Sequence, residues 1–428
     1  MKANVKFEFN NVGQGLFYTG EIDDFNFVYD CGSWNEVFLK SAIRAYKKRE
    51  LQGKPLDLLI ISHLDSDHVN GLNDLLHDAK ANTVILPYFN PLERLILALQ
   101  RIDLDEWYYD FLADPISFLI EREVKRIIVI GGAEEGVGTF SDETPPPATM
   151  PPPPSEKSDR TDRGEKMDIR LPHDQNLLEF LKKNEPRIEK FTRGNIVQTR
   201  NHYGFIKVLG AWVFRFFNYK VSETKLSNFK DCLTKKNIDF SSLDSIIRII
   251  KDACSRRKMK DCYRLLNKNL NDTSLVVYHG PVSRYKGVFR IHSDFLGKSV
   301  FYKYLNVMCL SPVPSYQLIS TFSHLGQLLT GDISLNYKRK FGEFVKHYST
   351  YFDTVLIFQL PHHGAKRSWN TNILNEVKNC HLWISSSGFS NRYGHPHISV
   401  VSDILNIGQC FACNNEFNKV AICGKIEW

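Results

Sequence analysis

An acid- and histidine-rich turn is the part of this chain whose side chains could most directly do chemistry. The run ISHLDSDHVNG, residues 61–71, follows an apolar segment and brings His63, Asp65, Asp67 and His68 into one short turn. Packing does not explain acids and histidines interleaved after a buried strand, and clusters of these residue types mark metal or catalytic sites. We therefore predict a metal site here; four solvated polar side chains in a surface turn are the alternative.

Two motifs in the last third of the chain place further candidate ligands at the ends of predicted strands. GQLLTGDIS puts Asp332 after an apolar run, and TVLIFQLPHHGAKRSW puts His362 and His363 after a strand that begins near Val355. Oxygen and imidazole ligands, with no cysteine in these motifs, fit one or two divalent ions. The two motifs therefore extend the predicted site.

The elements that must position these motifs alternate between strands and helices. Alternating apolar residues predict strands at 5–9, 25–29 and 58–61, and helical spacing predicts a helix over 36–50. The chain therefore begins as an α/β protein. Further along we predict helices at 92–122 and 176–183, and strands at 125–132 and 211–219.

The middle of the chain holds a proline-rich segment and a basic segment. Residues 139–170 contain many prolines and few large apolar residues, which predicts a disordered or polyproline-like linker. It is either a plain spacer or a docking site for a proline-binding module. Residues 225–269 are predicted to be helix-rich and basic. They form either a solvated helix face or the wall of a groove that follows a nucleic-acid backbone. The basic residues are Arg256, Arg257, Lys258 and Lys260.

Composition narrows the class of protein. A chain of 428 residues allows two or three domains, and the net charge of +7 favours an anionic substrate or partner. No stretch approaches the roughly 18 apolar residues of a membrane helix, and the first residues lack a secretory apolar core. We expect a cytoplasmic protein without membrane contact. Nine cysteines, an odd number without a regular framework, predict reduced thiols and no disulfides.

An ordered series of motifs carries a family resemblance. The series comprises NVGQG at 11–15, VYDCGS at 28–33, SHLDSDHVNG at 62–71, NDTSLVVYHG at 271–280, LLTGDI at 328–333, LPHHGAKRS at 360–368 and NRYGHPH at 391–397. With these motifs the chain resembles the metallo-β-lactamase superfamily, and within it the ComEC-type branch, the hydrolase domain of a DNA-uptake competence protein. The resemblance implies an α/β fold, an αββα sandwich of two mixed sheets with metals at one sheet edge, here with a large, partly helical central insertion.

The resemblance also implies a division of the chain. The two halves of the sandwich are expected at residues 1–90 and 271–428. Between them we expect a helical insertion at 91–138, the linker at 139–170 and a mixed, basic, helix-rich insertion at 171–270.

The same resemblance assigns the metal ligands by position. Asp67 and His68 would hold one ion together with His363, which is preferred to His362 because the family's last histidine ligand stands directly before a glycine. The second ion would be held by His63 and Asp65. Asp332 would bridge the two ions.

Departures from the family pattern affect which metal ions we expect and how firmly they are held. Asp65 stands where many members have a second histidine, and more carboxylate shifts preference from zinc toward manganese or magnesium. We expect two divalent ions, Mn²⁺ or Zn²⁺, with Mg²⁺ as a third candidate. No histidine stands at 271–274, so either Asp272 substitutes or one ion is loosely held. Asn11 replaces an aspartate, which we interpret as a mild structural change.

Phosphodiester hydrolysis is the reaction that such a shell predicts. Two ions can share a water, lower its pKa and stabilise an in-line displacement at phosphorus, with Asp67 in the catalytic shell. Lys366, followed by Arg367 and Ser368, is a candidate phosphate clamp or an ordinary exposed charge. Pro396 restricts the backbone of His395, which is a candidate general acid or part of a structural turn.

Cysteines near the C-terminal end form a separate candidate site. Cys410 and Cys413 have the spacing of a zinc knuckle, with Cys423 following, but no fourth ligand is evident unless Cys380 or His381 comes near. Buried free thiols in the last strands are the preferred interpretation.

The function predicted from these features is a metal-dependent nuclease acting on DNA or RNA. By analogy, the setting would be anti-phage defence with a protein partner bound through the insertion or the linker. One alternative is a phosphodiesterase for a small nucleotide or lipid, with a narrow pocket capped by residues 92–122 and with Trp107, Tyr108 and Tyr109 as stacking groups. The other is a non-enzymatic subunit of a complex.

Overall fold

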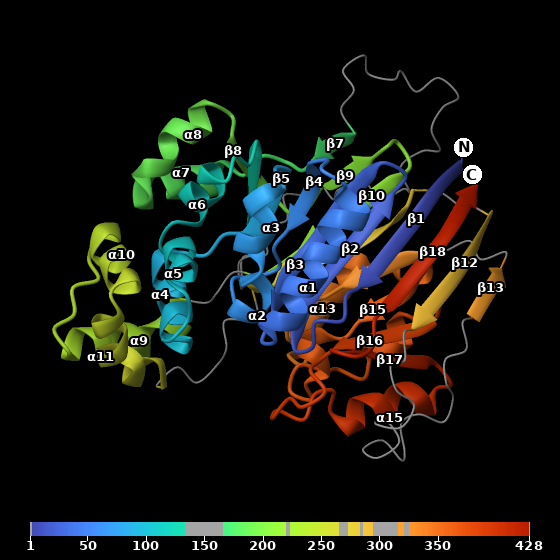
Figure 1. Cartoon of the computed structure of the whole chain (residues 1–428). Helices are drawn as coiled ribbons and strands as arrows, with labels where there is room; N and C mark the ends of the chain where they lie inside the picture. The colour runs from blue at the N-terminus through green and yellow to red at the C-terminus, as the bar shows by residue number, and fades with distance from the viewer. Residues whose placement is uncertain are drawn as a thin grey trace.

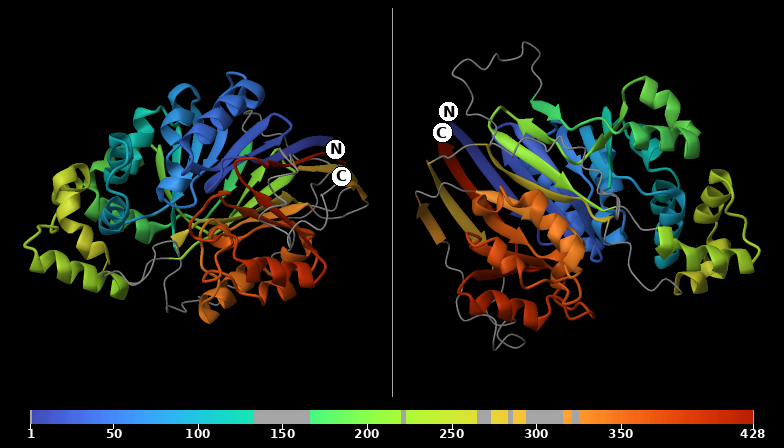
Figure 2. Two further views of the ribbon diagram at one scale, coloured as in Figure 1. Left: turned by 60° about the horizontal axis from the view of Figure 1, so that its bottom comes forward. Right: turned by 180° about the vertical axis from the view of Figure 1, so that it is seen from behind.

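Two facing β-sheets with helices on their outer faces form the body of the molecule (Figures 1 and 2). The computed structural model describes residues 2–132, 166–219, 223–264, 273–282, 286–293, 316–320 and 325–427. The left panel of Figure 2 shows helices from the N-terminal part of the chain above the sheets and helices from the C-terminal part below them. The predicted αββα sandwich is therefore confirmed.

The first sheet has ten strands, in the order β13-β12-β18-β1-β2-β3-β4-β5-β6-β8. Pairing is antiparallel from β13 to β3 and parallel from β3 to β8. The strands are β1 (Lys2–Phe9), β2 (Gly15–Ile22), β3 (Phe25–Ser33), β4 (Leu56–Ile60), β5 (Ala81–Pro87), β6 (Arg126–Gly131), β8 (Val197–Asn201), β12 (Lys286–Ser293), β13 (Tyr316–Ser320) and β18 (Val420–Glu427).

The second sheet has eight strands, in the order β17-β16-β15-β14-β11-β10-β9-β7. Pairing is parallel from β17 to β14 and antiparallel from β14 to β7. The strands are β7 (Met167–Arg170), β9 (Phe205–Val208), β10 (Trp212–Phe217), β11 (Val276–Pro281), β14 (Gly326–Leu329), β15 (Val355–Gln359), β16 (Leu382–Ser386) and β17 (Cys410–Asn414).

Helices cover both outer faces. α1 (Glu36–Tyr46) and α3 (Leu72–Asp78) pack on the first sheet, while α13 (Lys338–Tyr348), α14 (Ile373–Glu376) and α15 (Ile398–Asn406) pack on the second. The other α-helices of the described residues are α2 (Ser66–Val69), α4 (Pro91–Gln100), α5 (Glu106–Ala113), α6 (Pro115–Glu121), α7 (Gln175–Asn184), α8 (Glu189–Arg193), α9 (Glu223–Lys235), α10 (Leu243–Lys251) and α11 (Ala253–Arg264). No helix in the described ranges is long and apolar enough to cross a membrane.

An aromatic-rich core with one buried polar chain fills the space between the sheets. His279 is fully buried there among Phe7, Phe27 and Phe214, and its ring stacks on Phe214 with 5.5 Å between centroids. The indole Nε1 of Trp212 donates to His279 Nδ1 at 3.2 Å. Nδ1 is therefore the acceptor and the ring is neutral.

The chain of hydrogen bonds continues across to the other sheet. His279 Nε2 lies 2.9 Å from the Tyr18 hydroxyl, which donates to Gln327 Oε1 at 3.0 Å. Because Nδ1 of the ring accepts, Nε2 carries the proton and donates to Tyr18. These bonds satisfy polar groups that would be costly to bury alone.

A helical lobe, made of α4, α5 and α9 to α11, lies beside the sandwich (Figure 1). The buried Arg94 of α4 donates to Ala113 O at 2.9 Å and forms an ion pair of 2.7 Å with Glu185. Cys232 of α9 and Cys262 of α11 form a disulfide. The expectation of no disulfides was therefore wrong, because α9 and α11 pack together and bring the Cα atoms of these cysteines to 5.6 Å.

The central segment contributes more to the sheets than the predicted boundaries imply. β6 lies within the predicted insertion 91–138, and β8, β9 and β10 lie within 171–270. Apolar side chains of β6, β9 and β10 face the shared core, which is why the chain returns to the sandwich between helices. Most of the predicted linker lies outside the described residues, but its end, Met167–Arg170, forms β7.

Candidate metal centre

The acid- and histidine-rich turn follows β4, at the edge where the parallel strands of the first sheet end. His68 N donates to Asp65 O at 2.9 Å, and Gly71 N donates to Cys31 O at 2.8 Å, which fixes the turn on β3. A Cβ on Gly32 would lie 2.5 Å from the backbone of Asp67 and His68. Glycine at this position of β3 therefore allows the turn to approach so closely.

Three imidazoles from two loops converge at this edge. The ring centroids of His63 and His68 are 4.1 Å apart, and those of His68 and His363 are 5.4 Å apart. All three rings are buried. Within the described residues, their Nε2 atoms have no hydrogen-bond partner. Three buried nitrogens that face one another without partners are what a metal ion would satisfy.

A second partner orients each of these rings through Nδ1. His63 Nδ1 lies 2.8 Å from Ser62 Oγ, and His363 Nδ1 lies 2.6 Å from the carbonyl oxygen of Ser386. Contacts of this kind fix the orientation of the ring and leave Nε2 for a metal.

Asp30 orients the third ring and was missed as a site residue in the sequence. His68 Nδ1 lies 2.7 Å from Asp30 Oδ2, and Asp30 also accepts from Ser62 N and Ser62 Oγ, each at 2.6 Å. Asp30 is fully buried and has a φ of 57°. Its only sequence signal is its place in the VYDCGS motif at the end of β3.

Carboxylates complete two groups of candidate ligands that share Asp332. Asp332 Oδ1 lies 3.2 Å from His68 Nε2 and 3.6 Å from His363 Nε2, and Asp67 Oδ2 lies 3.5 Å from His363 Nε2. Ligand atoms of Asp67, His68 and His363 all lie within 4.8 Å of one another. This is the first group.

The second group surrounds the other oxygen of Asp332. Asp332 Oδ2 lies 3.9 Å from His63 Nε2 and 3.7 Å from His362 Nε2, and Asp65 Oδ2 lies 3.9 Å from His63 Nε2. Asp332 thus stands between the groups, where the bridging ligand was predicted. Imidazole nitrogens and carboxylate oxygens without thiols fit divalent transition ions.

His362 and His363 both face the site because of an unusual turn. Both residues have positive φ, 48° and 58°, and Gly364 follows at 83°. His362 N donates to Gly331 O at 3.0 Å, which joins this turn to the loop that carries Asp332. The sequence posed a choice between the two histidines, whereas the structure places His363 in the first group and His362 in the second.

The segment at 271–274, just before β11, has no histidine and contributes a hydroxyl group to the site. Ser274 Oγ accepts from Asp332 N at 3.1 Å and lies 3.3 Å from His63 Nδ1. The alternative ligand Asp272 lies outside the described residues.

Burial and mutual charge perturb the titration of these groups. Burial, with the nearby Asp67 and Asp332 carboxylates, raises the pKa of Asp65 to about 7. Burial, with the charge of His68, lowers the pKa of His63 to about 3. Burial opposes the charge on His68, but Asp332 and Asp30 hold its pKa well above the ordinary value. The raised pKa values of Asp65 and His68 both reflect carboxylates crowded around one point, an arrangement that suits a cation.

A cavity of about 540 Å³ opens onto the two groups. Asp65, Asp67, Asp332, His362 and His363 line it. Its remaining wall comes from other segments and includes Gln14, Trp34, Gln100, Arg101, Tyr108, Lys260, Tyr263, Arg392, Tyr393 and His395. Trp34, Arg101, Arg392 and Tyr393 were not predicted as site residues, because neither Trp34 nor Arg101 lies in a catalytic motif and only the histidines of NRYGHPH suggested chemistry.

The candidate general acid His395 lies at the cavity. Its ring centroid is 5.8 Å from that of His362 and 6.3 Å from that of His363. Asn391 holds the loop, since its Oδ1 accepts from His395 N at 2.9 Å. Burial and the two neighbouring imidazoles lower the pKa of His395 to about 4, so the ring is neutral at pH 7.

Other candidates lie away from the cavity. Lys366 and Arg367 are exposed and do not line it, because the chain turns outward after Gly364. Arg256 is buried and stacks on Tyr109 at 3.4 Å, so it supports the helical lobe. Lys260 is the member of the basic stretch that lines the cavity.

Of the three aromatic residues proposed as stacking groups, only Tyr108 lines the cavity. Its hydroxyl donates to Leu64 O at 3.0 Å, and the Tyr109 hydroxyl donates to Arg101 O at 2.8 Å. Trp107 packs against Phe118. These contacts hold the lobe against the site, and Trp107 lines a different cavity from the one that opens onto the candidate ligands.

The cysteine pair near the C-terminal end does not form a ligand cluster among the described residues. Cys410 and Cys413 lie on β17 and are three positions apart, so they face opposite sides of the strand. Cys423 lies on β18 in the other sheet. The three thiols are free, but the prediction that they are buried was wrong, since Cys410 is exposed and Cys413 and Cys423 are partly exposed.

One family model matches the part of the chain that carries the first three motifs. The metallo-β-lactamase superfamily model matches residues 11–92. No curated protein matches the chain. One similar structure is the metallo-β-lactamase fold protein YhfI from Bacillus subtilis, with 9% identity, a TM-score of 0.35, and coverage of 97% of this chain and 98% of that one. Another is a long form RNase Z from yeast, with 9% identity, a TM-score of 0.33, and coverage of 90% of this chain and 36% of that one. The part of the chain that is similar to the metallo-β-lactamase superfamily is therefore residues 11–92, which carry the NVGQG, VYDCGS and SHLDSDHVNG motifs.

Proposed function

We propose that this protein is a metal-dependent hydrolase that cleaves phosphodiester bonds of DNA or RNA. The observation that carries the proposal is the position of Asp332, whose two carboxylate oxygens lie 3.2 Å from His68 Nε2 and 3.7 Å from His362 Nε2. A carboxylate between two imidazole groups is suited to hold two cations side by side.

Each ligand group would hold one divalent ion. Asp67, His68 and His363 would hold the first, and His63, Asp65 and His362 the second, with Asp332 shared. Mn²⁺ and Zn²⁺ are the leading candidates, and Mg²⁺ is the third. When bound, such ions supply an activated water and stabilise charge on phosphate oxygens.

The wall of the cavity supports an anionic substrate. Arg101, Lys260 and Arg392 line it, and none of them lies in the motifs that hold the metal ligands. These cations would attract and orient a phosphodiester, since arginine and lysine are the usual phosphate contacts. A lactam or thioester would gain nothing from them.

The catalytic proposal is tested by removing the shared carboxylate. We expect the Asp332→Asn variant to lose more than about a hundredfold of the Mn²⁺-dependent cleavage of nucleic acid, the order of loss for a preorganised charge in an active site. Single- and double-stranded DNA and RNA are incubated with Mn²⁺, Zn²⁺ or Mg²⁺ and with a chelator. The Asp353→Asn variant is the matched control, since Asp353 is an exposed carboxylate before β15, at the end opposite His362.

Two results would contradict the proposal. One is the absence of cleavage by the wild type with any ion; the other is equal activity of the wild type and Asp332→Asn. Elemental analysis is run in parallel, and we expect about two ions per chain in the wild type. Fewer than about one would favour a non-catalytic subunit.

His395 is proposed as the general acid for the leaving oxygen. A phosphate in the cavity would favour the charged imidazolium and so oppose the low pKa of the empty site. We expect His395→Gln to slow cleavage of nucleic acid by about a hundredfold or more. A p-nitrophenyl phosphodiester should be nearly unaffected, because its leaving group departs without a proton. Equal loss on both substrates would contradict the role.

A further inference from the structure

We propose that Trp34, Arg101, Arg392 and Tyr393, here called the stacking wall, bind an unpaired nucleobase next to the phosphate that is cleaved. The inference rests on the proposed function and goes beyond it, because it selects single strands over duplexes. All four side chains line the same cavity as the candidate ligands.

The members of the stacking wall contact one another in a row. The guanidinium of Arg101 lies 4.5 Å from the centroid of the Trp34 ring. The rings of Trp34 and Tyr393 meet edge to face, with 5.1 Å between centroids. Arg392 lies 5.5 Å from the Tyr393 ring. Two adjoining aromatic rings, with a guanidinium group against each of them, thus line one side of the cavity.

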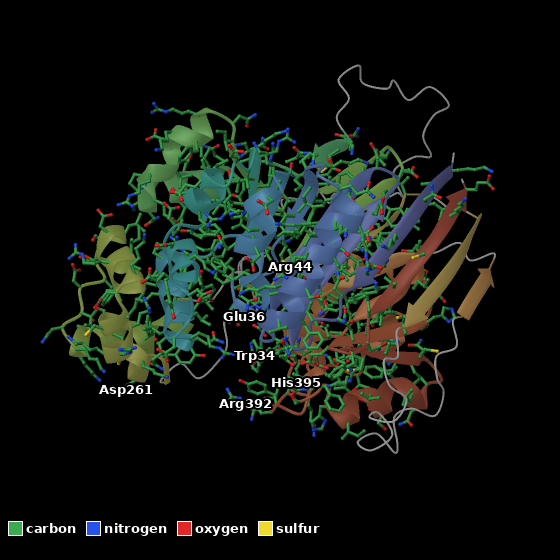
Figure 3. All side chains as sticks on the ribbon, viewed as in Figure 1. Trp34, Glu36, Arg44, Asp261, Arg392 and His395 are labelled. Atoms are coloured by element: carbon green, nitrogen blue, oxygen red, sulfur yellow. A yellow bond between two sulfur atoms is a disulfide. The ribbon has the colours of Figure 1, made fainter. Side chains whose placement is uncertain are left out.

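The row leads to the candidate ligands through His395. Tyr393 stacks on His395 with 5.8 Å between centroids and an interplanar angle of 15°. The His395 ring in turn lies 5.8 Å from that of His362. A base on the stacking wall and a phosphate at the ligands would therefore be neighbouring parts of one nucleotide chain. Figure 3 shows the labelled Trp34, Arg392 and His395 together at the end of the sandwich that faces the helical lobe.

Three segments distant in sequence build the stacking wall. Trp34 follows β3, Arg101 follows α4 and Tyr393 lies in the loop between β16 and α15. From the helical lobe, Tyr263 of α11 adds another ring to the same cavity. Burial raises the pKa of Tyr263 to about 12, with smaller effects from Asp65, Tyr393 and Arg101, so its hydroxyl stays protonated as a donor.

Packing alone does not account for these side chains. Tyr393 leaves 50% of its surface exposed. Among the described residues, the buried indole Nε1 of Trp34 has no hydrogen-bond acceptor. A buried donor without a partner costs free energy unless a ligand or water satisfies it. A base edge offers such an acceptor.

The charge of the stacking wall selects the class of ligand. Arg101, Arg392 and the nearby Lys260 are cations, so a quaternary ammonium head group would be repelled although aromatic rings are present. Planar bases stack on aromatic and arginine planes irrespective of sequence, and the adjoining phosphates pair with the cations. In a duplex the base faces are covered by their neighbours, so the stacking wall would reach only an unpaired base.

Equilibrium binding tests the inference independently of cleavage. The full-length Asp332→Asn chain is titrated into three fluorescein-labelled probes of equal length: oligothymidylate, an abasic strand with the same phosphates, and a duplex. Anisotropy is the readout. We expect oligothymidylate to bind about tenfold more tightly than the abasic strand, which is the order of one or two stacked bases. The duplex should bind more weakly than oligothymidylate.

Variants then assign the preference to the stacking wall. In the same background, Tyr393→Ala should bring the thymidylate-to-abasic ratio close to one, whereas the matched control Tyr393→Phe should preserve it. Arg101→Gln should weaken both strands alike and lower the salt slope by about one. Circular dichroism and urea unfolding check that each variant folds. The Trp34→Phe variant keeps an aromatic ring but removes the Nε1 donor, so it probes that donor separately.

Three results would overturn the inference: equal binding of thymidylate and abasic strands, an unchanged ratio in Tyr393→Ala, or a duplex that binds as tightly as the single strand. Failure of the proposed function is a separate result. A base preference without cleavage by the wild type would reject the hydrolase and keep the stacking wall, and cleavage without base preference would do the reverse.

Discussion

Hydrogen bonds on the far side of the histidine rings decide which nitrogen is offered to a metal. His68 is the clearest case, because Asp30 engages its Nδ1 at 2.7 Å and two bonds from Ser62 hold Asp30 in turn. Asp30 therefore acts as a positioning residue through His68. Outer carboxylates of this kind make the ligand more basic and fix its orientation.

Removing the charge of Asp30 should weaken metal binding. We expect Asp30→Asn to lower affinity for Mn²⁺ or Zn²⁺ by about 10- to 100-fold, because one oxygen acceptor for Ser62 and His68 is replaced by a donor. Competition with a chelating indicator measures the affinity without any enzymatic assay.

A matched control lies on the neighbouring strand. Asp57 is also a buried carboxylate, but it stands near the start of β4 and accepts from Asn26 N at 3.0 Å, at the end of that strand away from the site. Asp57→Asn should leave the affinity unchanged. If both variants lose affinity equally, Asp30 has no specific role in orienting His68.

At the scale of elements, the two sheets are joined by the polar chain from Trp212 through His279 and Tyr18 to Gln327. Burial lowers the pKa of His279 from 6.5 to about 3, because the apolar surroundings disfavour the charged ring. Protonation would also remove the acceptor that Trp212 needs. The sandwich therefore contains a histidine that must stay neutral for the sheets to pack.

This neutral histidine should make stability depend on pH. The unfolded chain takes up a proton on His279 as pH falls through about 6.5, whereas the folded chain does so only near pH 3. Its contribution is thus present above pH 6.5 and is lost as pH falls toward 3, at up to about 1.4 kcal/mol per pH unit. Urea unfolding at pH 8 and pH 4.5 measures the effect.

The His279→Gln variant isolates the contribution of His279 to this pH dependence, because glutamine keeps a donor and an acceptor but does not titrate. The variant should be less stable than the wild type at pH 8, and the difference should shrink by about 2 to 3 kcal/mol at pH 4.5. The control His77→Gln concerns an exposed histidine and should show no such change. Parallel pH profiles for wild type and His279→Gln would contradict the prediction.

At the scale of the whole molecule, folding pairs the first strand with the last and brings loops from distant parts of the chain to one site. β1 pairs with β18, so the first and last strands are neighbours, and the candidate ligands come from loops at 63–68, 332 and 362–363. The helical lobe then supplies Arg101, Lys260 and Tyr263 to the cavity. An insertion between the two halves thereby shapes the substrate side of a site whose ligands lie in the halves.

Sequence alone determined the features that depend on local pattern. Apolar periodicity predicted β1, β3, β4 and α1, because alternating burial is visible within a few neighbouring residues. The order of the motifs predicted the sandwich through the family resemblance. The family resemblance placed the HLDSDH turn, Asp332 and His363 in one predicted site, although they follow strands of two different sheets.

Only the tertiary structure decided contacts between segments without a local signature. It placed His362 opposite His63, assigned Asp30 to His68, paired Cys232 with Cys262, and brought Trp34, Arg101 and Tyr393 into one row. It also left Lys366 outside the cavity, although that residue stands three positions after His363. The physical reason is that such contacts depend on strand order, on positive φ in one turn and on helix packing across the fold, none of which a short stretch of residues encodes by itself.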